Sequence, residues 1–348
     1  MHRCIALAKN GIGKTYPNPM VGAVIVHQGK IIGEGWHAKA GEAHAEVIAI
    51  QSVSDQSLLP KSTIYVSLEP CSHFGKTPPC ADLIINKKIK NVVIGSIDPH
   101  SKVAGRGIEK LRNAGCQVVV GVLESECNDL NKRFFKYHQQ NRPYIFLKWA
   151  QTKDGFMDIV RSNDSKKESH WISNSVSRQL AHKLRAQEQA ILVGCNTVLN
   201  DNPKLTCRDW FGENPLRLVI DSKQRISKNH HILSDRQKTV VFNKADNNDL
   251  LSEYVGLEKL DFKENIPGQI CNYLYDLQIQ SVIVEGGLAT LQSFIDANLW
   301  DEAHVFSGNV IFEKGLNAPE LKGAKSHDVY LQGDVLSVFY NDFFKTYT

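Results

Sequence analysis

One histidine and two cysteines in the first quarter of the chain are the residue types of a metal site. His44 stands in His44-Ala45-Glu46, Cys71 follows Pro70, and Cys80 lies a little further on. An imidazole and two thiolates make a three-ligand zinc set, which leaves the fourth tetrahedral position open for a water. Zinc lowers the pKa of such a water towards neutrality. The spacing therefore predicts a hydrolytic centre that holds one Zn²⁺ per chain, with His44, Cys71 and Cys80 as ligands.

Glu46 favours a catalytic zinc over a structural one. It follows the histidine by two residues and is not needed as a ligand, so it is placed to carry protons. A structural zinc, or no zinc at all, is the alternative. Structural sites tend to have four protein ligands, and His73 is the only other Cys or His at a fitting interval. We predict that Glu46 takes a proton from water and passes it to a leaving amine.

The pattern His-x-Glu followed by Pro-Cys-x-x-Cys is typical of zinc deaminases that act on nucleobases. In this chain the thiols are separated by eight residues, 72–79, instead of two. The segment Pro-Cys-Ser-His-Phe-Gly-Lys-Thr-Pro-Pro-Cys, residues 70–80, resembles the pyrimidine deaminases of riboflavin biosynthesis. The resemblance implies an N-terminal α/β domain of the cytidine-deaminase-like, three-layer kind.

The same resemblance implies that Asn18, between two prolines, and His37 line the base pocket. Two further pocket residues follow from residue chemistry and position. Lys76, in the segment between the thiols, is expected to contact a phosphate. Asp98 follows a strand at its carboxyl end, where ligands bind in such sheets. A turn residue is the alternative for Asn18, and a solvated loop lysine is the alternative for Lys76. His100 stands where the family commonly has Asn.

Glu285-Gly286-Gly287 lies between an expected strand, 282–284, and a helix that opens at Leu288. Glycines let a backbone approach a phosphate closely, and the amides of a helix N-terminus face the anion. Gly-Gly between a strand and a helix is common, so the motif alone indicates only a possible nucleotide site.

Residues 147–155 and 190–208 resemble the reductases of the riboflavin pathway, which have a dihydrofolate-reductase-like α/β fold. The resemblance implies an NADPH site formed by Ala150, Trp171, Thr197, Asp201, Gly286, Gly287 and Leu288. It implies a substrate site formed by Ser169, Arg185, Leu205, Arg208 and Glu285. The family usually has a short turn where this chain has 156–168, which leaves the position of Ser169 open.

Three points in this half follow from residue chemistry. Ser222, with Lys223 and Arg225, follows a strand and could hold the 2′-phosphate that distinguishes NADPH from NADH. Guanidinium groups bind phosphate through paired hydrogen bonds, which suits Arg185 and Arg208; surface arginines are the alternative. Lys148, Lys153 and Asp154 are all candidates to assist proton transfer, and the sequence does not choose among them.

Strands and helices alternate in both halves, which predicts sheets covered by helices. Residues 139–143 form a polar stretch that ends at a proline, so we expect a deaminase domain over 1–142 and a reductase domain over 143–348. The expected strands are 21–26, 30–33, 63–68, 92–95, 117–120, 144–149, 190–193, 216–220, 239–242 and 282–284. The expected helices are 1–9, 43–51, one from about 80, 105–114, 124–138, 175–187 and 288–298. Residues 158–170 and 243–266 stay unassigned.

Composition limits the remaining possibilities. The 348 residues suggest two domains, and 41 basic against 37 acidic side chains give a net charge of +4, too small and dispersed to favour a nucleic-acid partner. No apolar stretch approaches a membrane span and no signal-peptide core is present, so a cytoplasmic enzyme is expected. The six cysteines outside the zinc set fit reduced thiols.

Taken with the resemblance, the sequence predicts a bifunctional enzyme of riboflavin biosynthesis and a homo-oligomer, dimer or tetramer. Its first domain would deaminate a phosphorylated diaminopyrimidine, and its second would use NADPH to reduce the ribosyl group to ribityl. Two rivals are a tRNA base deaminase with an appended RNA-binding domain and an interaction protein with a degenerate deaminase fold. The first would need a basic, aromatic-studded surface, and the intact zinc set argues against the second.

Overall fold

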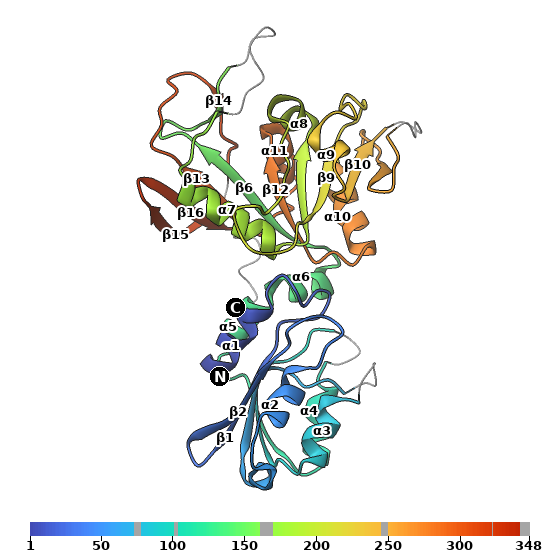
Figure 1. Cartoon of the computed structure of the whole chain (residues 1–348), viewed down its shortest axis with the longest axis vertical. Helices are drawn as coiled ribbons and strands as arrows, with labels where there is room; N and C mark the ends of the chain where they lie inside the picture. The colour runs from blue at the N-terminus through green and yellow to red at the C-terminus, as the bar shows by residue number, and fades with distance from the viewer. Residues whose placement is uncertain (73–77, 101–103, 161–169, 245–249, 322, 342–348) are drawn as a thin grey trace. The chain divides into compact units, whose positions relative to one another are not determined.

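The computed structural model describes residues 1–72, 78–100, 104–160, 170–244, 250–321 and 323–341 (Figure 1). The chain folds into two compact units, Met1–Asn141 and Arg142–Thr348. Each unit has its own sheet and its own hydrophobic cores. Among the described helices, none combines the length and the apolar character that a membrane crossing requires.

The first unit is built on a five-stranded sheet in the order β2-β1-β3-β4-β5. Its strands are β1 (Gly22–His27), β2 (Lys30–Trp36), β3 (Thr63–Leu68), β4 (Asn91–Ser96) and β5 (Gln117–Val120). β1 runs antiparallel to β2 and β3, whereas β3, β4 and β5 are parallel to one another. Gln28 and Gly29 make the β1–β2 turn with φ of 48° and 76°, a conformation that the Gln-Gly pair tolerates.

Helices cover both faces of this sheet. On one face α2 (Ala45–Gln51), α3 (Cys80–Asn86) and α4 (Arg106–Asn113) contribute to a core with alternate side chains of the strands, including Ile25 and Ile64. On the other face α1 (His2–Ala8) packs through Cys4 and Leu7 against Val24. Two 3₁₀ turns, η1 (Lys9–Gly11) and η2 (Gln56–Lys61), complete the unit's first half. The predicted three-layer arrangement is confirmed.

The predicted single helix over 124–138 is wrong, because the segment forms α5 (Glu124–Leu130) and α6 (Lys132–Gln140). Asn131, between them, has φ of −107° and ψ of 22°. Its side-chain amide accepts a hydrogen bond from the Met20 N–H at 2.8 Å and donates one to the Met20 carbonyl at 2.9 Å. This buried tertiary contact fixes the break, and the helical periodicity of the sequence does not reveal it.

The second unit is built on a nine-stranded sheet in the order β11-β10-β9-β8-β12-β6-β13-β16-β15. The strands from β11 to β13 are parallel, and β16 and β15 continue the sheet antiparallel. The strands are β6 (Tyr144–Gln151), β8 (Ala190–Gly194), β9 (Leu216–Ile220), β10 (Thr239–Asn243), β11 (Val255–Lys259), β12 (Ser281–Gly286), β13 (Glu302–Ser307), β15 (Ala324–Leu331) and β16 (Asp334–Tyr340). A separate two-stranded sheet pairs β7 (Phe156–Asp158) with β14 (Leu316–Asn317).

Helices again pack on both faces. α10 (Ile266–Asp276) and α11 (Leu288–Asp296) pack on one face of the sheet, against Leu147 and Leu192. α7 (Ser175–Gln187), α8 (Cys195–Asp201) and α9 (His231–Ser234) lie on the other, against Phe146 and Val193. Seven of these strands and helices are predicted from the sequence. The rest, among them α8, α10 and the last four strands, are not.

Candidate active sites

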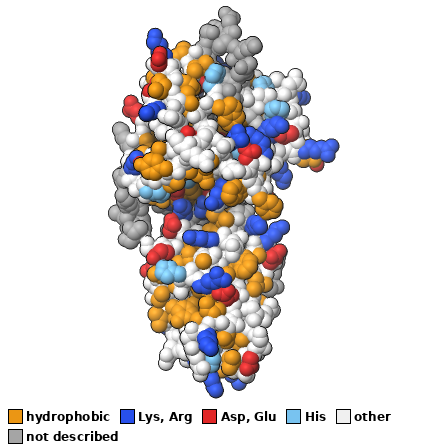
Figure 2. Space-filling model, turned by 60° about the vertical axis from the view of Figure 1, so that its left-hand side comes forward, with side chains coloured by type: hydrophobic (Ala, Val, Ile, Leu, Met, Phe, Trp, Pro, Cys, Tyr) orange, Lys and Arg blue, Asp and Glu red, His pale blue; other side chains and the backbone are white. Residues whose placement is uncertain are grey.

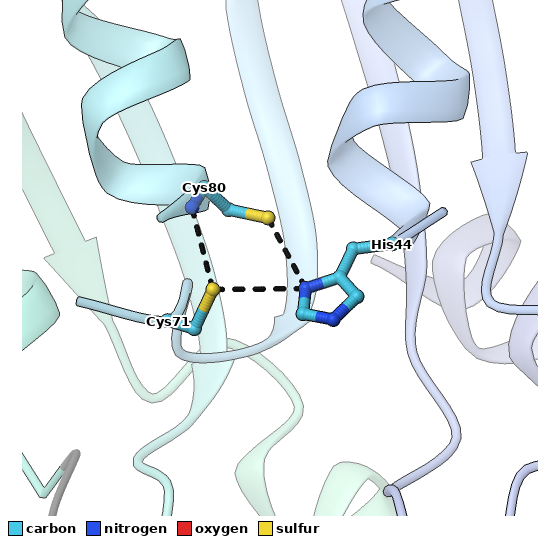
Figure 3. Close-up of side chains that lie close together, drawn as sticks. All are labelled: His44, Cys71 and Cys80. Atoms are coloured by element: carbon cyan, nitrogen blue, oxygen red, sulfur yellow. Dashed lines mark hydrogen bonds between the residues drawn. The ribbon is translucent and has the colours of Figure 1, made fainter. Parts of the chain in front are cut away.

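The three predicted zinc ligands converge from three separate segments (Figure 3). His44 immediately precedes α2, Cys71 follows the end of β3, and Cys80 is the first residue of α3. The Nδ1 atom of His44 lies 3.6 Å from the Cys71 Sγ and 3.3 Å from the Cys80 Sγ. All three ligand atoms lie within 4.8 Å of one another. At ordinary zinc bond lengths a tetrahedral site has nitrogen–sulfur separations of about 3.6 Å, so the donor set fits zinc.

His44 is not inside a helix as predicted. It is the N-cap residue of α2, with extended backbone (φ −72°, ψ 160°), and this turns its ring towards the thiols. The N-terminus of α3 acts on Cys71 as well, because the Cys80 N–H donates to the Cys71 Sγ at 3.3 Å. Hydrogen bonding from Cys80, together with His44, lowers the pKa of the Cys71 thiol to about 4. Cys71 is therefore held ready as a thiolate ligand.

Glu46 lies in the first turn of α2 and is only 3% exposed. Burial, reinforced by the neighbouring Cys71 thiolate, raises the pKa of its carboxyl to about 7. A carboxyl with a pKa near neutrality exists in both protonation states at the working pH, as a group that accepts and then returns a proton requires.

Asn18 and His37 lie together beside the ligand set. The Asn18 Nδ2 is 3.1 Å from the His37 Nε2, and the His37 Nδ1 is 3.1 Å from the Ala43 carbonyl. The carbonyl requires a donor, so Nδ1 carries the proton and Nε2 accepts from Asn18. Burial lowers the pKa of His37, which keeps the ring neutral. Its ring centroid is 5.4 Å from that of His44.

Asp98 is buried just beyond β4, and its Oδ1 accepts a hydrogen bond from the His100 N–H at 2.8 Å. Burial raises the pKa of the Asp98 carboxyl to about 6, and the nearby Glu69 and Cys71 add to the shift. The His100 ring packs edge-on against His138 of α6, with centroids 4.7 Å apart. Lys76 lies outside the described residues.

The second unit contains a cavity of about 930 Å³ at the carboxyl ends of β6, β8, β9 and β12. This is the edge at which parallel sheets bind ligands. The predicted residues that line it are Ala150, Trp171, Arg185, Thr197, Asp201, Leu205, Arg208, Ser222, Glu285, Gly287 and Leu288. Gly286 is the last residue of β12 and adjoins this wall, with φ of 120°. Ser169 lies outside the described residues.

One side of the cavity is suited to a phosphate-bearing cofactor. α8 and α11 both begin at it, and their first turns lie close together, because a Cβ at Gly194 would stand 2.6 Å from the Thr290 Oγ1. The Arg225 Nη2 donates to the Asn196 Oδ1 at 2.8 Å, near Ser222 on the same wall. Amides of helix N-termini, a hydroxyl and a guanidinium are groups that bind phosphates.

The other side holds a partly buried charge cluster. Arg185 donates to both oxygens of Glu285, at 2.9 and 2.6 Å, and to the Thr206 carbonyl at 3.1 Å. The Lys148 Nζ lies 4.0 Å from the same carboxylate. Burial would raise the pKa of Glu285, but Arg185 and Lys148 outweigh it and lower the value to about 2. Burial lowers the pKa of Lys148, partly offset by Glu285. The cluster has two cations and one anion, so it is suited to an anionic or electron-rich ligand.

The sequence matches known families over both units. Residues 1–96 match the model of the cytidine and deoxycytidylate deaminase zinc-binding region, and residues 143–325 match that of the RibD C-terminal domain. The riboflavin biosynthesis protein RibD of Aquifex aeolicus is 42% identical over 325 residues, which is 92% of this chain and 89% of that protein. The chain belongs to the RibD family. RibD of Escherichia coli is 37% identical over 322 residues, 88% of this chain and 86% of that protein.

Solved structures agree with this assignment. A Thermotoga maritima protein, described as a diaminohydroxyphosphoribosylaminopyrimidine deaminase/5-amino-6-(5-phosphoribosylamino)uracil reductase, superposes with a TM-score of 0.89 at 38% identity, covering 98% of this chain and 97% of that one. RibD from Acinetobacter baumannii gives 0.87 at 30% identity, covering 97% of both chains. The chain is thus a bifunctional RibD enzyme of riboflavin biosynthesis, a deaminase joined to a reductase, with zinc and NADPH as cofactors.

Within this RibD reductase unit the sequence did not point to His182 and Asp209. The Asp209 N–H donates to the buried His182 Nδ1 at 3.4 Å, and Arg178 pairs with the Asp209 carboxylate at 2.7 Å. Arg178, His182 and Arg185 share one face of α7, at spacings of four and three residues. That helical spacing is the signal from which the cluster could have been predicted. The adjacent Arg208 is exposed and lines the cavity.

Proposed function

We propose that this chain deaminates 2,5-diamino-6-ribosylamino-4(3H)-pyrimidinone 5′-phosphate and then reduces the product to 5-amino-6-ribitylamino-uracil 5′-phosphate. We assign the first step to the zinc unit and the second to the unit with the large cavity. The observation that carries the proposal is the convergence of His44, Cys71 and Cys80 beside a buried Glu46, in a chain whose second unit has a separate ligand cavity.

Deamination exchanges a ring C–NH₂ for C=O and releases ammonia, with water as the co-reactant. Bound zinc would supply activation of that water. We propose that the Glu46 carboxylate accepts the proton that leaves the water and then donates it to the nitrogen of the departing amine. Asn18 and the neutral His37 are assigned to the pyrimidine edge, since together they offer an amide and a ring nitrogen beside the ligand set.

Reduction adds a hydride to the anomeric carbon and a proton to the ring oxygen, so that the ribose opens to ribityl. NADPH supplies the hydride when bound. Among the three candidates for the proton, Lys148 fits best, because it is partly buried in the cavity wall beside Glu285. Lys153 is exposed, and Asp154 is exposed and accepts hydrogen bonds from the amides of Phe312 and Glu313. We assign the residues on the Ser222 and Gly287 side of the cavity to the cofactor. The substrate is assigned to Arg185, Leu205, Arg208 and Glu285.

The test is incubation of the zinc-loaded protein with the diamino substrate, with and without NADPH, followed by mass spectrometry. Without NADPH the product should show exchange of NH for O, and with NADPH a further gain of two hydrogens. Reduction without prior deamination, or no turnover at all, would overturn the proposal.

A tRNA deaminase is the main rival. Basic and acidic side chains are interspersed on the face seen in Figure 2, which favours a small substrate over a nucleic acid. A gel shift with tRNA at physiological salt separates the two, because a tRNA deaminase would bind and this enzyme should not.

A further inference from the structure

Glu69 is a buried carboxylate that is neither a zinc ligand nor the proton carrier of the deaminase site. It directly follows β3 and precedes Pro70 and the ligand Cys71, and it is only 4% exposed. A buried carboxylate requires several hydrogen-bond donors, since an unpaired one is costly. The donors here are backbone amides from a different part of the chain.

Four amide N–H groups donate to the Glu69 carboxylate. Its Oε1 accepts from Gly107 at 2.9 Å and Ile108 at 3.3 Å, and its Oε2 accepts from Gly105 at 2.9 Å and Asp98 at 3.3 Å. Three of these amides belong to the start of α4, whose N-cap residue Gly105 provides no side-chain cap. Glu69 therefore performs the capping that a local Ser, Thr or Asp ordinarily provides, with a negative charge at the positive end of the helix.

The fourth bond reaches the residue assigned to the substrate. The Asp98 backbone N–H donates to the Glu69 carboxylate, and the Asp98 side chain accepts a hydrogen bond from the His100 N–H. On the other side, the first turn of α4 packs against the zinc-ligand segment so closely that a Cβ at Gly107 would collide with the Pro70 carbonyl. The Glu69 side chain thus connects the zinc-ligand segment, to which it belongs, with the start of α4 and with the Asp98 segment.

We infer that Glu69 is a positioning residue of the deaminase, which sets the place of Asp98 relative to the zinc ligands. The inference rests on the proposed function of this unit. A residue that sets the place of a substrate contact acts mainly on KM, whereas loss of zinc or of Glu46 acts on kcat. The carboxylate is required because both oxygens accept from two amides; a glutamine would present an NH₂ group to two N–H donors.

The experiment compares Glu69→Gln with Asp55→Asn, a matched control. Asp55 also caps a helical turn of the same unit, accepting from the Ser57 N–H at 3.0 Å, but it is exposed. We expect E69Q to raise the KM for deamination by about tenfold, the effect of one charge-assisted hydrogen bond, with zinc content retained and kcat changed by less than about threefold. D55N should leave both constants unchanged.

An unchanged KM in folded, zinc-loaded E69Q would overturn the inference, and so would a loss of activity that follows zinc loss alone. If E69Q does not fold, single-residue hydrogen exchange on the wild-type chain tests whether Glu69 holds the amides of Asp98 and Gly105. The amides of Asp98 and Gly105 should be as protected as the interior of α4, and rapid exchange at both would refute the contact. A wild-type chain that does not deaminate the substrate contradicts the proposed function instead, so the two failures are distinguishable.

Discussion

At the scale of single residues, the deaminase site depends on a carboxyl that can hold and release a proton. Glu46 is two residues from His44 in the sequence and buried beside the thiols in the fold. Its role could be predicted from residue types and spacing, because His-x-Glu followed by two cysteines is typical of zinc deaminases. Glu69 could not be predicted, because helix caps are normally local and its four donors come from 29 to 39 residues away.

Replacing Glu46 with Gln keeps the shape of the side chain but removes its capacity to accept a proton. We expect deamination to fall by about 10² to 10⁴-fold, the range for general acid–base catalysis, while zinc content stays the same. Substrate turnover and metal analysis measure the two effects. The control is Glu42→Gln, an exposed carboxylate two residues before His44. Near-normal turnover of E46Q would remove Glu46 from the mechanism.

Arg208 offers an exposed guanidinium to the reductase cavity. Removal of a charge-assisted, two-point contact costs about 1.5–3 kcal/mol, so R208A should lower kcat/KM for the deaminated substrate by about tenfold to hundredfold. NADPH affinity should hardly change. R236A, an exposed arginine away from the cavity, is the matched control. A defect confined to NADPH binding would mean that Arg208 is assigned to the wrong ligand.

At the scale of elements, most strands with a continuous apolar run could be predicted, such as β3 and β9. The β15–β16 hairpin was missed, although Gln332 and Gly333 repeat the Gln-Gly turn of β1–β2 with φ of 51° and 101°. The reason is that β15 is exposed over most of its length, so it lacks the alternating burial that marks a strand. α8 was missed because its residues, CNTVLND, favour turns and caps over helix interiors.

The β12–α11 connection depends on a glycine conformation. Gly286 has φ of 120°, a region that costs other residues about 1–3 kcal/mol. We expect Gly286→Ala to raise the Kd for NADPH by about fivefold to hundredfold, measured by fluorescence titration. Gly333→Ala is the matched control, because its φ of 101° imposes similar strain at a hairpin turn. It should lower stability and leave the Kd unchanged, and an equal Kd in G286A would refute the role of this connection.

At the scale of the whole molecule, each unit contains a histidine that burial keeps neutral. Burial, and then His100, lowers the pKa of His138 in α6 to about 4. Burial, and then Arg185 and Arg208, does the same for His182 in α7. The unfolded chain binds these protons near pH 6.5, so it holds more protons than the native state between pH 6.5 and 4. Stability should therefore fall as the pH falls through this window.

Urea denaturation at pH 7 and pH 5 measures that loss. H138Q and H182Q should each flatten the dependence of the unfolding free energy on pH, whereas replacement of the N-terminal His2, which is exposed, should not. Identical slopes for all variants would show that other groups cause the acid sensitivity.

Each unit contains the full set of residues that we assign to its reaction. A mixture of E46Q and R208A chains should consequently convert the diamino substrate to the ribityl product faster than the two variants do separately, because the intermediate made by one chain can be used by the other. Mass spectrometry of the mixture follows the product. A rate equal to the sum of the separate rates would mean that the intermediate does not leave the chain that makes it.

The joining of the two units in one polypeptide, Met1–Asn141 and Arg142–Thr348, has a consequence for the cell. Translation of a single message produces both active sites in a fixed one-to-one ratio, whatever the level of expression. At a given concentration of the diamino substrate, the steady concentration of the deaminated intermediate is then independent of how much protein is made. The kinetic constants of the two sites set it at that substrate concentration, so mutations in either site change it there, whereas changes in gene dosage do not.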